Sequence, residues 1–374
     1  MEWGLATLGL TLLLVAGVSK RLSAAPLTPA MVVVGVGVLV GPLLLDDLAL
    51  GLFSSFSVSD ALILAVILAP TDAGLGSAVV TDARLPQRVR QSLNVESGLN
   101  DGICVPLLLI VLATASGAGG PAHPAQVIGE EIGYGLAGGG VAGALAACIV
   151  VAAGGRGLIE NAWRQIMPVA AAVLAYGIAD ALGGSGFIAA FTAGALFGLL
   201  TRHAANGMMR FTEEIGSLLD TTTFLVFGAV LLGPALEHVS WQIALYAALS
   251  LTIVRMLPVA ISLWGTHARG PTVTFIGWFG PRGLASIVFA VIVEDTSQAH
   301  SDVLLTATYL TVGLSVLLHG LSAAPLVSRY ATWYRGAAGE RVQAMESEPV
   351  HEHRARERPA ALSRGVRDCE ALRP

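Results

Sequence analysis

Charged residues are scarce in this chain. Of its 374 residues only 13% are charged and 54% are hydrophobic, whereas charged residues make up about 25% of a typical soluble domain. Fifteen of the charged residues follow Tyr334, so the first 334 residues are more apolar than the average indicates. This scarcity excludes an ordinary soluble enzyme. Nothing in the distribution of basic residues supports nucleic-acid binding.

Cysteine is also rare. Cys104, Cys148 and Cys369 are widely separated, so the sequence offers neither a disulfide framework nor the spacing of zinc ligands. We expect no bound cofactor and no enzymatic activity.

What the sequence has in abundance is long apolar runs, each long enough to cross a hydrocarbon core of about 30 Å as a helix. The runs are continuous and do not alternate in hydrophobicity, which favours helices over the strands of a membrane barrel. The sequence therefore predicts an all-α polytopic membrane protein with eleven transmembrane helices. These are expected at residues 3–18, 27–45, 59–81, 93–116, 126–153, 164–182, 185–201, 213–234, 239–264, 272–293 and 302–326.

The connections between these spans differ in charge from one side to the other. One side carries the basic residues Lys20, Arg21, Arg84, Arg88, Arg90, Arg156, Arg164, Arg202, Arg210, Arg269 and Arg329. The other side carries Asp46, Asp47, Glu237, Glu294, Asp295 and Asp302. Because basic loops stay in the cytoplasm, this predicts a multi-pass protein of the cell membrane with an external N-terminus and a cytoplasmic C-terminus. Residues 1–334 form the membrane domain, and residues 335–374 are expected to form a disordered cytoplasmic tail.

One predicted span carries a candidate cation site. Pro70 removes a backbone donor, and Gly74 and Gly76 weaken the helix, so the span at 59–81 is expected to break beside Asp72. Unwound backbone inside a membrane is tolerated only where protein or a water-filled cavity satisfies it, and its freed carbonyl oxygens suit a small cation. A carboxylate beside such oxygens predicts a cation site. A proline kink with Asp72 as a local cap is the alternative.

The next span supplies a second carboxylate. Helical spacing puts Glu96 and Asn100 on one face, with Ser97 and Asp101 on a neighbouring face. Only a short loop separates the two spans, so they are expected to be antiparallel neighbours in which Asp101 approaches Asp72. Repulsion and burial then favour a proton on at least one carboxylate. Competition between a proton and a cation for one site is the physical basis of exchange. Alternatively, Asp101 only bonds neighbouring helices.

A second interrupted span, 272–293, mirrors the first, with Pro281 and several glycines inside an apolar run. Paired interruptions in the two halves of a chain indicate an inverted-repeat transporter with its site at mid-membrane. Arg282 keeps its proton and therefore needs an anionic partner at this depth. Glu96 is the expected partner, because Asp72 and Asp101 are better left free to titrate.

Four other ionisable residues at membrane depth receive no transport role. Asp60, Asp180 and Asp220 lie nearer helix ends, where hydrated or capping roles are expected. Arg255 is expected to snorkel or to pair with Asp220.

Three blocks of the sequence resemble the sodium/proton exchangers of the first monovalent cation/proton antiporter family. They are residues 70–72, 96–102 and 277–286, and the stretch 184–191 is also similar. The resemblance implies thirteen helices, arranged as two inverted six-helix repeats around a linker helix, and a homodimer in the lipid membrane. It also implies a core domain that moves against a dimerisation domain.

The resemblance implies roles for individual residues as well. Asp72 and Asp101 match positions that bind the proton or, transiently, the sodium ion, and Thr71 and Ser97 match positions that supply further oxygens. Asn100, before the second aspartate, implies electroneutral exchange of one cation for one proton. Glu96 and Arg282 match a structural ion pair.

The eleven expected helices fall two short of the family's thirteen. With the linker at 126–153, four helices precede it and six follow, so the first repeat is incomplete. Two functions therefore stay open: an antiporter exchanging sodium, with potassium or lithium as alternatives, for protons; or a transport-incompetent, antiporter-like membrane protein. An intramembrane aspartyl protease also needs two apposed aspartates, but Asp101 lies in Leu-Asn-Asp-Gly rather than in a Gly-x-Gly-Asp setting.

Overall fold

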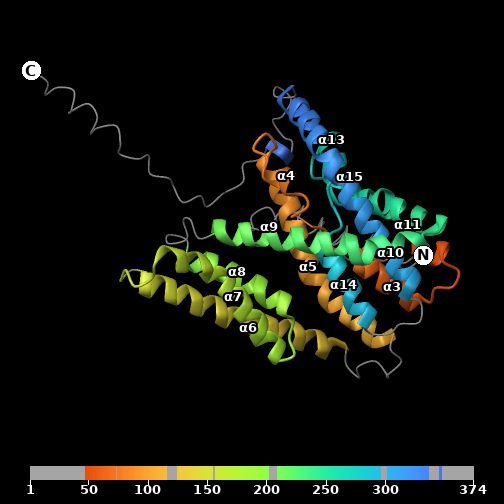
Figure 1. Cartoon of the computed structure of the whole chain (residues 1–374). Helices are drawn as coiled ribbons and strands as arrows, with labels where there is room; N and C mark the ends of the chain where they lie inside the picture. Colours follow the sequence, from red (N-terminus) through yellow and green to blue (C-terminus); the bar gives the residue numbers. More distant parts are fainter. Residues whose placement is uncertain are drawn as a thin grey trace, which may run out of the picture.

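The computed structural model describes residues 47–72, 74–115, 124–154, 156–201, 209–295, 301–336 and 345–347. Within these ranges the regular structure is helical, and no strand occurs among them. The predicted all-α class is confirmed (Figure 1). The predicted spans 3–18 and 27–45, and most of the tail 335–374, lie outside the described residues.

Each of the other nine predicted spans matches a helix or an interrupted pair of helices. The first half contains α3 (Val58–Ile67), α4 (Ser77–Val80), α5 (Gln87–Ala115), α6 (Pro124–Gly154), α7 (Asn161–Ala181) and α8 (Gly186–Leu200). The second half contains α9 (Met209–Val226), α10 (Gly233–Ala235), α11 (Trp241–Leu251), α12 (Ile253–Ser262), α13 (Gly270–Trp278), α14 (Leu284–Asp295) and α15 (Ser301–Gly336). A π-helical turn, Phe227–Leu232, joins α9 to α10.

Within the described ranges, four helical stretches are long and apolar enough to cross a membrane. They are Gly129–Gly154, Glu214–His238, Trp241–Ser262 and Asp302–Gly336. The last one extends α15 ten residues past its predicted end at 326. The interrupted helices are shorter because each is split near its middle.

Local sequence explains where several helices begin. A capping box starts α3: the Ser57 hydroxyl accepts the Asp60 N–H at 3.2 Å, and the Asp60 carboxylate accepts the Ser57 N–H at 2.9 Å. Ser185 caps α8 and Ser240 caps α11 in the same way, through one side-chain bond each. Such caps satisfy amide groups that have no partner in the first helical turn. The expected capping role of Asp60 is confirmed.

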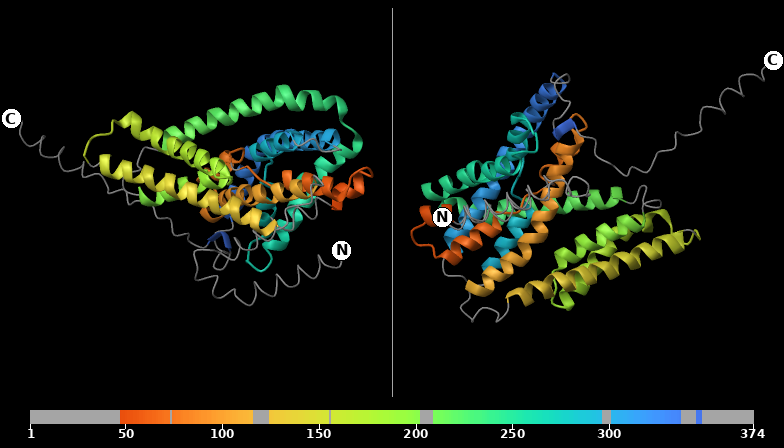
Figure 2. Two further views of the ribbon diagram at one scale, coloured as in Figure 1. Left: turned by 90° about the horizontal axis from the view of Figure 1, so that it is seen from below. Right: turned by 180° about the vertical axis from the view of Figure 1, so that it is seen from behind.

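Three helices, α6, α7 and α8, form a body of their own on one flank of the molecule (Figures 1 and 2). Its core is built from small side chains, namely Ala142, Ala175, Ala179, Ala189 and Ala193, with a second cluster around Phe197. A Cβ added to Gly143 would lie 2.6 Å from the Ala193 carbonyl oxygen. Small residues at these positions therefore let the helix backbones approach closely, as in other membrane bundles.

The second body holds both interrupted helices. Its main core contains large side chains from α3, α5, α11, α14 and α15, including Ile63, Leu108, Tyr246, Phe289 and Leu304. Helix α9 packs against α7 on one side and against α14 on the other. It therefore contacts both bodies.

The turn before α5 ends beside α15. Arg84 pairs with Asp82 at 2.7 Å, and its hydrogen bonds hold the pKa of Asp82 below its usual value. The guanidinium also donates to the Ser328 hydroxyl at 3.4 Å. Both arginines predicted on the cytoplasmic side here, Arg84 and Arg329, therefore lie at the same end of the larger body.

Close helix packing in the smaller body can be tested at one glycine. We expect Gly143→Ala to lower the melting temperature, because the added methyl would overlap the α8 backbone, at a cost of about 1–3 kcal/mol. Gly140 on the same helix has no atom within 4 Å of an added Cβ, so Gly140→Ala is the matched control and should melt no lower than the parent. Thermal unfolding in detergent, followed by circular dichroism, measures both. Equal melting of the two variants would contradict the packing.

Candidate functional site

The first interruption lies where the sequence predicts it. Helix α3 ends at Ile67, the backbone is non-helical from Pro70 to Asp72, and α4 begins at Ser77. Pro70 cannot donate a backbone hydrogen bond, so the helix has no means of continuing its ladder at this point.

The second interruption crosses the first. Helix α13 ends at Trp278 and α14 begins at Leu284, with non-helical backbone between them. The Asp72 N–H donates to the Pro281 carbonyl at 2.8 Å, so the two unwound segments touch directly. The structure therefore brings together two segments more than 200 residues apart in the sequence.

Carbonyl groups freed by the first interruption are bonded by side chains from the second. Arg282 donates to the Ala69 carbonyl at 2.7 Å and to the Pro70 carbonyl at 3.3 Å. Ser286 donates to the Ile67 carbonyl at 2.7 Å. The C-terminal end of a helix carries partial negative charge, so a guanidinium there is favourable. This crossing meets the requirement that backbone polar groups be satisfied at membrane depth.

The Asp72 carboxylate, in turn, is bonded by backbone N–H groups. Its carboxylate accepts the N–H groups of Gly74 at 2.7 Å and Leu75 at 3.3 Å, and that of Leu284, at the start of α14, at 3.0 Å. A helix N-terminus stabilises an anion. Any Cβ on Gly283 would overlap this carboxylate, so glycine is what allows the close approach. Three backbone N–H groups thus hold this carboxylate in place.

Helix α5 holds the other side of the unwound segment. The Ser97 hydroxyl donates to the Thr71 carbonyl at 2.6 Å, and the Asn100 amide donates to the Thr71 hydroxyl at 3.1 Å. Thr71, Ser97 and Asn100 are buried. The buried Oδ1 atoms of Asn100 and Asp101 have no hydrogen-bond partner. Four of the five predicted ligands thus lie in contact, and Asp101 is close enough to Asp72 for their charges to interact.

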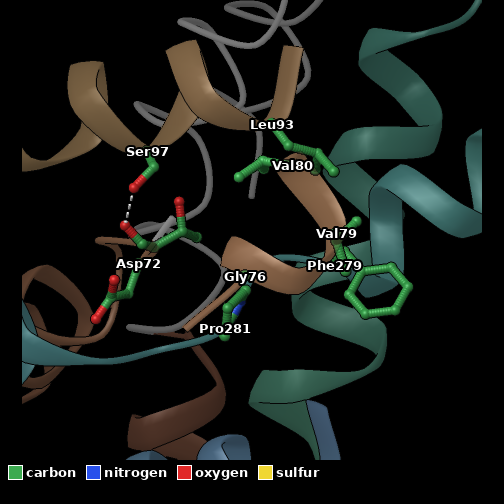
Figure 3. A pocket seen from close by; sticks show the side chains of 9 residues that line it. Asp72, Gly76, Val79, Val80, Leu93, Ser97, Phe279 and Pro281 are labelled. Atoms are coloured by element: carbon green, nitrogen blue, oxygen red, sulfur yellow. Dashed lines mark hydrogen bonds between the residues drawn. The ribbon is translucent and has the colours of Figure 1, made fainter. Parts of the chain in front are cut away.

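A small, partly open pocket lies beside these residues (Figure 3). Its polar wall is formed by Thr71, Asp72 and Ser97. The opposite wall is apolar and includes Val79 and Phe279, the latter from the second interruption. In the part of the chain that the structure describes, this places the candidate oxygens at the edge of a space that water or an ion can enter.

The predicted ion pair between Glu96 and Arg282 is not what the structure forms. Glu96 pairs instead with Arg255 of α12, and both side chains are almost fully buried. The Arg282 guanidinium is directed to the carbonyls of the first interruption, so its anionic partner is replaced by backbone oxygens. The expectation that Arg255 snorkels or pairs with Asp220 is wrong, because Glu96 lies within its reach.

Sequence reasoning missed several supporting residues. Arg255 sits near the middle of its apolar run, and that depth was the signal that it needs a buried partner. Ser315 on α15 accepts the Arg282 N–H at 2.7 Å, and His319 bonds the Trp278 carbonyl at 2.8 Å. These two residues brace the second interruption. No sequence pattern marks them, because a polar residue on a long helix has many possible orientations.

An all-helical membrane body in which two interrupted helices cross beside carboxylates is the fold of a secondary transporter. Comparison with known families agrees. The family model described as "Sodium/hydrogen exchanger, transmembrane" matches residues 8–329. The chain belongs to this family.

Individual relatives are about one quarter identical. The Na(+)/H(+) antiporter NhaP of Pseudomonas aeruginosa is 27% identical over 314 residues, which cover 78% of this chain and 72% of that protein. The K(+)/H(+) antiporter NhaP of Alkalimonas amylolytica is 26% identical over 276 residues, which cover 71% and 46%. The chain spans about half the length of the Alkalimonas relative and 58% of an Na(+)/H(+) antiporter of Schizosaccharomyces pombe.

A solved structure shares the fold. The sodium proton antiporter MjNhaP1 from Methanocaldococcus jannaschii superposes with a TM-score of 0.63 at 17% identity. The superposition covers 88% of this chain and 99% of that one. The predicted antiporter fold is thereby confirmed.

The identity of the Glu96 partner can be decided by double-mutant cycles. Breaking a buried pair by removing one member costs about 3–5 kcal/mol, because the other charge is left uncompensated. We therefore expect strong coupling between Glu96→Gln and Arg255→Gln, with the double variant more stable than the summed losses predict.

The matched cycle pairs Glu96→Gln with Arg282→Gln. We expect weaker coupling there, because Arg282 bonds carbonyl groups in place of Glu96. Thermal melting of the purified protein in detergent gives each free-energy difference. Stronger coupling with Arg282 would show that the originally expected pair is the real one.

Proposed function

We propose that the protein is a secondary antiporter that exchanges sodium for protons across the cell membrane. The observation that carries this proposal is the crossing of the two interruptions, where Asp72 lies near Asn100 and Asp101, each of which has a buried oxygen without a hydrogen-bond partner. Relatives named for sodium and for potassium both occur, so potassium and lithium are candidate alternative cations. The family membership gives the exchange class, and the residue roles below are our inference.

The two aspartates have different tasks in this proposal. Asp72 binds the cation with a carboxylate that three backbone N–H groups hold in place. Asp101 has a buried oxygen without a donor and faces the charge of Asp72, which favours a bound proton on Asp101. A cation that enters between them replaces this proton. Because the proton and the cation neutralise the same charge, the site holds one or the other.

Neutral oxygens complete the cation site. Hard cations such as sodium prefer carboxylate, carbonyl and hydroxyl oxygens. Thr71 and Ser97 supply such oxygens next to Asp72, and the Oδ1 of Asn100 is a buried acceptor with no donor in contact. Asn100 is uncharged, so it adds no further proton-releasing group beside Asp101. One cation for one proton then leaves the net charge moved at zero.

Alternating access follows from the two bodies. The body of α6, α7 and α8 has its own apolar cores, and the other body carries the crossing and the candidate site. A rigid displacement of one against the other would expose the site first to one side and then to the other. We also propose a homodimer, with the N-terminus outside and the C-terminus in the cytoplasm. Apolar side chains exposed on the smaller body, such as Phe191, face lipid or a second copy.

The exchange itself is tested in everted membrane vesicles. We expect addition of sodium to change the internal pH, as recorded by a pH-sensitive dye, at pH values between about 6 and 9 where the competing proton can leave. Asp101→Asn keeps the shape but removes the titrating group, so its exchange should fall to background while the protein remains in the membrane. Asp82→Asn, in the exposed turn before α5, is the control and should transport normally.

Two results would count against this proposal. Normal transport by Asp101→Asn would refute the site. Absence of exchange by a folded parent protein would favour the alternative, a transport-incompetent relative that keeps the family's motifs. Adding two helices to the first repeat would then test whether its shortness is responsible.

Electroneutrality is tested separately by electrophysiology on a solid-supported membrane. We expect sodium jumps to produce no sustained transport current, although the dye reports a pH change in the same proteoliposomes. The reason is that one positive charge enters for each one that leaves. A current proportional to the rate of the pH change would contradict the exchange of one cation for one proton.

A further inference from the structure

A third carboxylate faces the candidate site from outside the interrupted helices. Asp220 lies on α9 and is half-buried. Its Oδ2 is 3.2 Å from the point that a Cβ on Gly74 would occupy, and the Asp72 Oδ1 is 3.0 Å from the same point. Both carboxylates therefore lie within contact distance of one point beside Gly74. This position differs from the helix-end role that the sequence predicted for Asp220.

No basic residue in the described ranges forms an ion pair with Asp220. The neighbouring hydroxyls are also committed elsewhere: Thr221, Thr222 and Thr223 each donate to a carbonyl one turn earlier on α9. Asp220 and Asp72 are close enough for their charges to interact. Two facing carboxylates repel each other unless a cation or a proton lies between them.

A buried oxygen beside Asp72 also points to a missing ligand. Asn100 is only 1% exposed, and its amide donates to Thr71, the residue before Asp72. Its Oδ1 accepts no hydrogen bond. A buried acceptor of this kind is costly unless an ion, a proton donor or water meets it. Oxygens that could bind a cation thus lie near the unwound segment on two helices, Asn100 on α5 and Asp220 on α9.

Gly74 keeps the space between Asp72 and Asp220 open. A methyl group at this position would sit between the two carboxylate oxygens, in contact with both. Its backbone N–H bonds Asp72 Oδ1 at 2.7 Å, which fixes the orientation of that oxygen. The gap is therefore bounded by one fixed carboxylate and by one that comes from a different helix.

The helix that carries Asp220 belongs to the boundary between the two bodies. It packs against α7 of the smaller body and against α14 of the larger one, whereas Asp72 lies on the interrupted helix of the larger body. A cation held by both carboxylates would bridge this boundary. Its binding would depend on how the bodies are arranged.

We infer that Asp220 is an affinity-determining residue for the transported alkali cation, which it holds together with Asp72 at Gly74 before the cation reaches Asp101. This inference rests on the proposed function. It adds a binding residue on α9 to a site otherwise built from α5 and the interrupted helices. Asp220 needs no proton exchange of its own, because its charge serves only to attract and hold the cation.

The test measures exchange in proteoliposomes as a function of sodium concentration. We expect Asp220→Asn to raise the sodium concentration for half-maximal exchange about tenfold, equivalent to about 1.4 kcal/mol of lost binding, with little change in the maximal rate. Asp220→Glu should recover part of the affinity. Gly74→Ala should weaken sodium affinity from the opposite side, by filling the gap. Glu214→Gln, an exposed acidic position on the same helix, is the control and should match the parent.

The outcomes separate this inference from the proposed function. If the parent protein does not exchange, the proposed function fails. If the parent exchanges and Asp220→Asn keeps the parent's sodium dependence, or loses maximal rate alone, the role of Asp220 is overturned. Size-exclusion chromatography of each variant shows whether it is folded. Should Asp220→Asn not fold, an unchanged sodium affinity in Gly74→Ala would equally overturn the inference.

Discussion

Backbone groups inside a membrane have no water to bond, so every helix interruption must find its partners within the protein. Here each interruption supplies them to the other. Arg282 and Ser286 bond carbonyls at the end of α3, while Asp72 bonds an N–H at the start of α14 and donates its own to Pro281. Neither unwound segment is stable alone at this depth. The site exists because the two segments cross.

The crossing also determines which charged side chains have bonding partners within the protein. Arg282 is held by carbonyl oxygens and Glu96 by Arg255, so these groups compensate one another and stay fixed. The Asp72 carboxylate is bonded by a backbone N–H at the N-terminus of α14. Asp101 is left as the carboxylate with an unbonded buried oxygen. A site that exchanges a cation for a proton needs a carboxylate whose oxygens are not all hydrogen-bonded. If every oxygen already had a partner, none would be left to bind a cation.

The helices are packed in two bodies, each with its own core, and the crossing belongs to one of them. Small residues hold α6, α7 and α8 together at short distance, whereas the larger body packs bulky aliphatic and aromatic side chains. Cores built separately can move as units, since close-packed interiors transmit displacement with little deformation. Helix α9 contacts both bodies and brings Asp220 to the edge of the site. In the proposed mechanism, a residue at the boundary between the bodies therefore helps to bind the cation.

The sequence by itself determined the class, the spans within the described residues and both interruptions, because apolar length, proline and glycine act locally along the chain. It also indicated Asp72, Asp101 and their neighbours on α5, since helical spacing fixes which residues share a face. Only the tertiary structure decided that Glu96 pairs with Arg255 and that Asp220 faces Asp72. Those contacts join helices far apart in sequence. Their partners depend on how whole helices rotate and cross, which no local pattern encodes.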